Sequence, residues 1–165
     1  NAAIVVNSFS KYFSMTGRRV GLLVVPEAFT RTIYRLAQNH YNAPHTYSQV
    51  PALGAFDGIE ELEEIKSRYA RNRSLQRNEL PAAGLTNLLP ADGAFYLYAD
   101  IRDLTEDSEA FAQTMLREIG VAATPGIEFD SLRGHSYLRL ISAGSQHEMS
   151  EAVRRIGTWL RSRLH

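Results

Sequence analysis

The sequence predicts an α/β protein, because short apolar runs typical of buried strands alternate with segments of helical periodicity. Five runs have the length and composition of strands: 4–6, 21–25, 94–99, 121–123 and 137–141. Five segments repeat apolar residues every three or four positions and predict helices: 27–39, 48–56, 59–82, 108–119 and 147–164. No internal repeat or low-complexity tract interrupts this alternation.

The predicted helices differ in their apolar faces. The last one is strongly amphipathic, with apolar residues at helical spacing: Met149, Val153, Ile156, Leu160 and Leu164. The helix over 59–82 has a narrow apolar face and is otherwise highly charged. A long helix with a polar surface is typical of a connector between two compact regions.

Composition excludes several classes of protein. Apolar residues make up 44% of the 165 positions, as in an ordinary globular protein. Basic and acidic residues balance at 18 each, so no net field favours nucleic acid or a membrane surface as a partner. The chain has no cysteine, and its five histidines show no spacing typical of a metal site, so we expect no bound metal. Cytoplasmic location is compatible with this cysteine-free composition.

The first residues, NAAIVV, run directly into a predicted buried strand without a methionine or a lead-in segment. We therefore expect the chain to be the C-terminal part of a longer protein.

The stretch SFSKYFSMTGRRVG, residues 8–21, places a lysine among hydroxyl groups and guanidinium groups between two apolar strands. A solvated surface loop is one interpretation. The other is a site for pyridoxal phosphate, whose aldehyde reacts with a lysine amine and whose phosphate binds arginine and short hydroxyl donors. The end of a strand is also where open α/β sheets commonly bind ligands.

The same stretch resembles the lysine signature of fold type I pyridoxal-phosphate-dependent aminotransferases of class I/II. Three later segments resemble the family's motifs in the same order: PADGAFYLYADI (90–101), VAATPGIEF (121–129) and SYLRLISAGSQHEMSEAVRRI (136–156). The resemblance covers essentially the whole chain.

The resemblance implies a particular domain organisation. Residues 1–57 would be the C-terminal remnant of the large pyridoxal-phosphate-binding domain, at the end of a mixed, mostly parallel sheet. Residues 58–82 would be the interdomain helix, and residues 83–165 a small α+β C-terminal domain. Residues that bind the pyridine ring would lie upstream of the chain.

The resemblance also implies roles for four residues. Lys11 would hold pyridoxal 5'-phosphate as a Schiff base and would later carry the proton between the substrate Cα and C4′ of the cofactor. Ser8 and Arg19 would bind the phosphate. Arg139 would bind the α-carboxylate of the substrate, and strand alternation places it on the face opposite its neighbours Leu138 and Leu140.

The sequence leaves the roles of several other residues near the signature open. Arg18 stands where many members of the family have an aromatic residue, and a surface charge is its simplest interpretation. Ser10 and Thr16 could contact the cofactor or only the turn. Tyr41 and Asn42 could cap a helix or contribute to a neighbouring subunit's site, as in relatives.

The leading function is transfer of an amino group between an α-amino acid and a 2-oxo acid, in a homodimer. A carbon–sulfur lyase or synthase of the same fold is the nearest alternative. The cofactor-binding-like half of a transcription regulator is an alternative from another class. The chain by itself is expected to be inactive.

Overall fold

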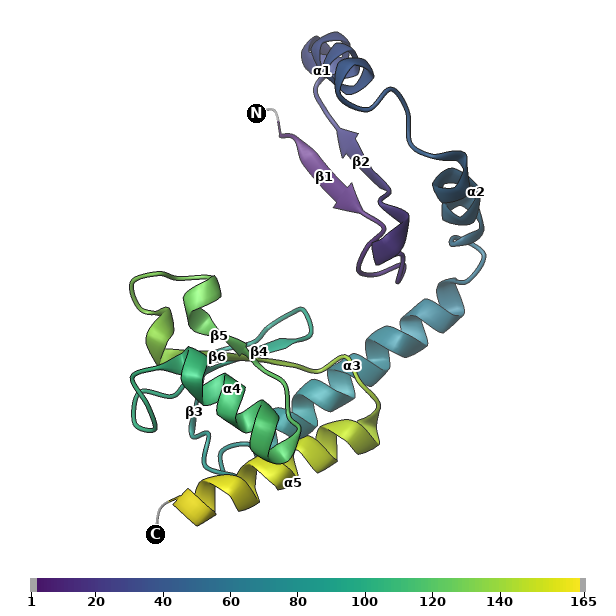
Figure 1. Cartoon of the computed structure of the whole chain (residues 1–165). Helices are drawn as coiled ribbons and strands as arrows, with labels where there is room; N and C mark the ends of the chain where they lie inside the picture. Colours follow the sequence, from purple (N-terminus) through teal and green to yellow (C-terminus); the bar gives the residue numbers. More distant parts are fainter. Residues whose placement is uncertain (1–2, 164–165) are drawn as a thin grey trace. The chain divides into compact units, whose positions relative to one another are not determined.

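Antiparallel strands organise both parts of the chain (Figure 1). The structure, a computed structural model, describes residues 3–163. These residues form two units, Asn1–Lys66 and Ser67–His165, with the boundary inside the long helix α3 (Ile59–Glu79). Each unit is described by itself, and the domain limits expected from the sequence stay a prediction.

The first unit is built on a two-stranded ribbon. Strand β1 (Val5–Ser8) pairs antiparallel with β2 (Gly21–Val24), and Ser8 lies opposite Gly21. Helices α1 (Glu27–His40) and α2 (Thr46–Gly54) follow. Both runs were expected to be buried, yet the side chains of both strands are exposed among the described residues. A two-stranded ribbon leaves both faces open unless another layer packs on them.

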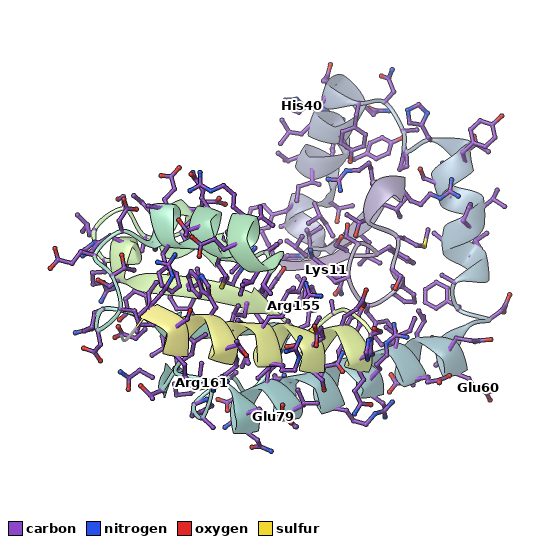
Figure 2. The ribbon with its side chains drawn as sticks, turned by 60° about the horizontal axis from the view of Figure 1, so that its bottom comes forward. Lys11, His40, Glu60, Glu79, Arg155 and Arg161 are labelled. Atoms are coloured by element: carbon purple, nitrogen blue, oxygen red, sulfur yellow. The ribbon has the colours of Figure 1, made fainter. Side chains whose placement is uncertain are left out.

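The second unit contains a four-stranded antiparallel sheet in the order β3-β4-β6-β5. The strands are β3 (Asn87–Leu88), β4 (Tyr96–Asp100), β5 (Thr124–Pro125) and β6 (Tyr137–Ile141). Two helices, α4 (Ser108–Ile119) and α5 (Gln146–Arg163), complete the unit with the last part of α3. Figure 2 shows α5 with Arg155 and Arg161 labelled along it.

One face of this sheet forms the hydrophobic core. Leu97, Ala99, Leu138 and Leu140 alternate inward from the two central strands and are almost fully buried. They pack in one cluster with side chains of α4 and α5 such as Met115 and Ile156. The opposite face carries the alternate residues of both strands, which are polar or aromatic and half-buried except for the exposed Ile141 at the end of β6. The core therefore fixes which residues of β4 and β6 face outward.

Two buried amides of α3 fasten this helix to the end of β6. The Asn72 amide donates to the backbone oxygens of Ser142 and Gly144, at 3.0 and 2.9 Å. The Gln76 side chain donates to the Ile141 oxygen and accepts from the Ser142 hydroxyl at 2.6 Å. Buried polar groups are stable when they are paired, and these bonds fasten α3 to the end of β6, although the Asn72 side-chain oxygen is buried without a partner among the described residues.

The sequence predictions differ from the structure in a few places. The strand predicted at 121–123 is wrong. Val121 is buried in the hydrophobic core, and pairing with β6 begins only at Thr124, the first residue of β5. Strand β3 was not expected. Leu164 of the predicted last helix lies outside the described residues. Within residues 3–163, no helix has the length and apolar content needed to cross a membrane.

Candidate functional site

Lys11, labelled in Figure 2, lies on a loop that is held closed by backbone hydrogen bonds. The Phe9 N–H donates to the Val20 oxygen at 3.1 Å, which continues the ribbon past β1 and β2. The Met15 N–H donates to the Phe9 oxygen at 3.1 Å, and the Ser14 N–H donates to the Lys11 oxygen at 3.0 Å. Lys11 therefore occupies a folded turn rather than an extended surface loop.

The side chains on both sides of Lys11 anchor this turn. Phe9 is buried and stacks on Phe13 at 4.5 Å between ring centroids, and both rings contact Phe56 edge-on, at 5.9 and 5.3 Å. The Tyr12 hydroxyl donates to the Glu63 carboxylate at 2.7 Å. This hydrogen bond raises the pKa of Tyr12. Aromatic packing of this kind adds roughly 0.5–1.5 kcal/mol per pair, so it fixes the backbone at Lys11.

Two serine hydroxyls and one guanidinium lie around a common hollow at the end of the ribbon. Ser8, Ser10 and Arg19 all line this open hollow, which has a volume of about 580 Å³. The Ser8 hydroxyl donates to the Ser10 hydroxyl at 2.9 Å, and the Ser10 N–H donates to Ser8 Oγ at 3.1 Å. Apolar side chains of β2 and α1, and Tyr41, make up most of the remaining wall.

This donor set fits the phosphate of pyridoxal phosphate. No carboxylate lines the described wall of the hollow, so its single guanidinium faces no competing acid there. The Arg19 guanidinium donates to the Thr16 backbone oxygen at 3.1 Å, which holds the side chain and leaves other N–H donors for a ligand. Hydroxyl donors beside an arginine are suited to a doubly charged phosphate. Lys11, directly after Ser10, supplies the amine that the aldehyde needs.

Backbone geometry brings the serines and Arg19 to the same place. Arg19 ends the short turn η1 (Thr16–Arg18) with a left-handed backbone, at φ 52°. Thr16 donates its hydroxyl to the Ser10 oxygen at 2.7 Å, so it supports the turn. A Cβ at Gly21 would lie 2.8 Å from the backbone oxygen of Asn7. Glycine is therefore required where β2 passes closest to β1, next to Ser8.

Arg139 lies in the second unit, on the outward face of β6. Its guanidinium is half-buried and donates to the Thr124 hydroxyl at 3.2 Å. The rings of Tyr96 and Phe129 flank it. No carboxylate of the described chain forms an ion pair with it. A guanidinium with free donors on a half-buried face can bind a carboxylate in a bidentate arrangement.

Other groups on this face have altered acidity. Burial raises the pKa of Tyr98, and the negative charge of Asp130 raises it further. The backbone N–H groups of Arg133 and Leu132 lower the pKa of Asp130 by hydrogen bonding to its carboxylate. Asp130 is therefore held as an anion by its own loop, where it pairs with Arg133.

The structure brings together some of the predicted residues and adds others. Ser8 and Arg19 line one hollow, and Lys11 lies on the turn between them. The roles of Ser10 and Thr16 were left open by the sequence. Ser10 lines the same hollow, whereas the Thr16 hydroxyl donates to the Ser10 backbone oxygen within the turn. Tyr96 was assigned no role in the site from the sequence, and its ring lies against Arg139. Asn42 has a left-handed backbone just after α1, and the Tyr41 N–H caps that helix on the Ala37 oxygen.

Arg18, interpreted as a surface charge, is exposed. Among the described residues, histidines and acidic side chains nowhere gather in a group of three or more that could hold a metal ion.

Comparison with known proteins identifies the family. The family described as aminotransferase class I and II matches residues 1–156. The chain belongs to this family. It is 46% identical, over 97% of its length, to the valine–pyruvate aminotransferase of Mycobacterium tuberculosis, and 31% identical, over 93%, to the aspartate aminotransferase of Sulfurisphaera tokodaii. The crystal structure of an aminotransferase from Mycobacterium tuberculosis superposes with a TM-score of 0.93 at 46% identity, covering 97% of this chain and 42% of that one.

These matches confirm the family resemblance and the α/β fold class expected from the sequence. They also confirm pyridoxal phosphate as the cofactor of the family to which the chain belongs. The chain spans 42% and 39% of the lengths of the two curated relatives.

A substitution at Gly21 tests the architecture of the hollow. We expect Gly21→Ala to weaken binding of pyridoxal phosphate to the full-length protein at least several-fold, because the new methyl group would displace β1 beside Ser8. Gly17→Ala is the matched control, since a Cβ there meets nothing within 4 Å. The measurement is cofactor affinity by absorbance titration. Equal losses in both variants, or no loss in Gly21→Ala, would contradict this account of the hollow.

Proposed function

We propose that this chain is the C-terminal portion of a pyridoxal-phosphate-dependent aminotransferase, which moves an amino group between an α-amino acid and a 2-oxo acid. The observation that carries the proposal is a hollow lined by Ser8, Ser10 and Arg19, together with the hydrogen-bonded turn on which Lys11 directly follows Ser10. Lys11 itself is not among the residues that line the hollow. Family membership supports the same reaction class, since the two relatives described above are named as aminotransferases.

Each residue has one task in this proposal. Ser8 and Arg19 bind the phosphate and so fix the position of the cofactor. Lys11 would hold the cofactor through Nζ, and the same amine would carry a proton between the substrate Cα and C4′ of the cofactor. Bound pyridoxal phosphate supplies an electron sink that stabilises negative charge at Cα. Arg139 binds the α-carboxylate and thereby sets the orientation of the substrate.

The proposal includes a homodimer in the cytoplasm. Three apolar side chains of α2 are largely exposed in the 165-residue chain: Tyr47 at 85%, Leu53 at 73% and Val50 at 64%. The remainder of the full-length protein or a second copy would cover them, and the homodimer is the second case. Exposed apolar groups of this size commonly mark contacts with another protein surface. The cytoplasmic location rests on the cysteine-free composition.

Amino transfer is tested with the full-length protein, pyridoxal phosphate, an amino acid and a panel of 2-oxo acids. New amino acid should appear only when a 2-oxo acid is present, as detected by chromatography. Release of ammonia and pyruvate without any 2-oxo acid would instead assign the protein to the carbon–sulfur lyases. The 165-residue chain alone should show no turnover, and ordinary turnover by it would contradict the proposal that the chain is only a portion of the enzyme.

Two arginine variants separate the two anion sites. Arg139→Ala should weaken amino-acid binding by a factor of roughly 30 or more, corresponding to about 2 kcal/mol for a lost charge-assisted pair, and should leave cofactor content nearly intact. Arg19→Ala should have the opposite effect and weaken cofactor retention. Cofactor content by absorbance and amino-acid affinity by titration give the two readings. Loss of cofactor in Arg139→Ala together with loss of amino-acid affinity in Arg19→Ala would contradict the proposal and would assign the phosphate to Arg139 and the carboxylate to Arg19.

A further inference from the structure

The guanidinium of Arg139 lies between two aromatic rings. Its central carbon is 4.4 Å from the ring centroid of Tyr96, on β4, and 4.3 Å from that of Phe129. These distances are within the range of cation–π contact. Tyr96 comes from the same sheet as Arg139, whereas Phe129 comes from the segment that follows the turn η2 (Gly126–Glu128).

The two rings determine how this guanidinium can be used. A guanidinium donates hydrogen bonds in its own plane, while aromatic rings contact its faces. One in-plane nitrogen, Nη2, donates to Thr124 on β5. No other hydrogen bond from this guanidinium to the described chain is present. The remaining in-plane donors are therefore available to a carboxylate.

Phe129 is held in place by an unusually close backbone contact. Gly126 and Gly134 are buried against each other, and a Cβ at Gly134 would lie 2.3 Å from the Gly126 backbone. The Gly134 oxygen accepts from the buried Ser108 hydroxyl at 3.0 Å. The Asp130 carboxylate accepts from two backbone N–H groups of the same loop. The loop that carries Phe129 is therefore held at its ends by the Gly126–Gly134 contact and internally by the hydrogen bonds to Asp130.

We propose that Tyr96 and Phe129 are positioning residues that hold the Arg139 guanidinium in the plane required to bind the substrate α-carboxylate. This inference rests on the proposed function of Arg139 and extends it to two residues that would act through their contact with the Arg139 guanidinium. This arrangement is specific for arginine. Rings on both faces orient a planar guanidinium, whereas the ammonium group of lysine is not planar and would not be oriented in this way.

The test uses the full-length protein with its cofactor and compares valine with isobutylamine, the amine that remains when the carboxylate of valine is removed. Binding is followed by the absorbance change of the cofactor. Tyr96→Leu and Phe129→Leu should each weaken valine binding about tenfold, which corresponds to about 1.4 kcal/mol and is within the range of a partly buried cation–π contact. Binding of isobutylamine and cofactor content should not change.

Three control variants separate positioning from general damage. Tyr96→Phe and Phe129→Tyr keep an aromatic face and should restore valine binding to within about twofold, since the cation–π contact is retained. Leu132→Ala alters an 83% exposed side chain on the same loop as Phe129 and should have no effect.

The outcomes distinguish the two proposals. Wild-type protein that binds valine no better than isobutylamine would overturn the carboxylate role of Arg139. The wild-type protein could bind valine more tightly than isobutylamine while Tyr96→Leu and Phe129→Leu keep the same preference. That result would support the carboxylate role of Arg139 and overturn the positioning role of the two rings. Leucine variants that weaken both ligands equally would also overturn it, because a structural defect does not depend on the carboxylate.

Discussion

The pairing of Ser8 with Gly21 across the β1–β2 ribbon is the constraint on which the candidate cofactor site depends. The lysine signature begins at one strand and ends at the other, so only their antiparallel pairing brings Ser8 and Arg19 to one hollow. The pairing is close enough that Gly21 tolerates no side chain against the Asn7 oxygen. Everything between the two strands is then a short loop with fixed ends, which makes the position of Lys11 a consequence of the ribbon.

The candidate carboxylate site depends on a different kind of support. Arg139 is fixed by alternation along β6, because Leu138 and Leu140 are buried in the core on the other face. Strand alternation determines the face of the sheet on which Arg139 lies, but it does not determine the direction in which the long side chain points. Thr124 and the rings of Tyr96 and Phe129 supply the orientation. The two proposed anion sites thus use the same residue type in two environments, one an open turn and the other a half-buried face between rings.

Much of the secondary structure could be predicted from periodicity. The segments at 108–119 and 137–141 agree with α4 and β6 in both bounds, because each has a regular pattern of buried positions. Strand β3 has two residues and no pattern, and β5 includes Pro125, which has no N–H to donate to a ladder. Val121 is apolar because it packs in the core, so an apolar run there indicated burial and not strand pairing.

The candidate site was predictable only as far as local sequence determines it. Ser8, Lys11 and Arg19 lie within one motif, and Arg139 within another. The contact of Arg139 with Tyr96 and Phe129 joins residues from three separate segments, and no local pattern encodes such a meeting. Ser10 was ambiguous because a residue next to the lysine can face either way; in the structure its hydroxyl accepts from the Ser8 hydroxyl, and its role in the site stays a prediction.

The identity of the lysine that bonds to the cofactor tests the central claim most directly. Full-length protein would be loaded with pyridoxal phosphate, reduced with borohydride, digested and mapped by mass spectrometry. This chain contains two lysines, Lys11 and Lys66. The account predicts the pyridoxyl group on Lys11 alone, and a pyridoxyl group found on Lys66 with Lys11 unmodified would contradict it.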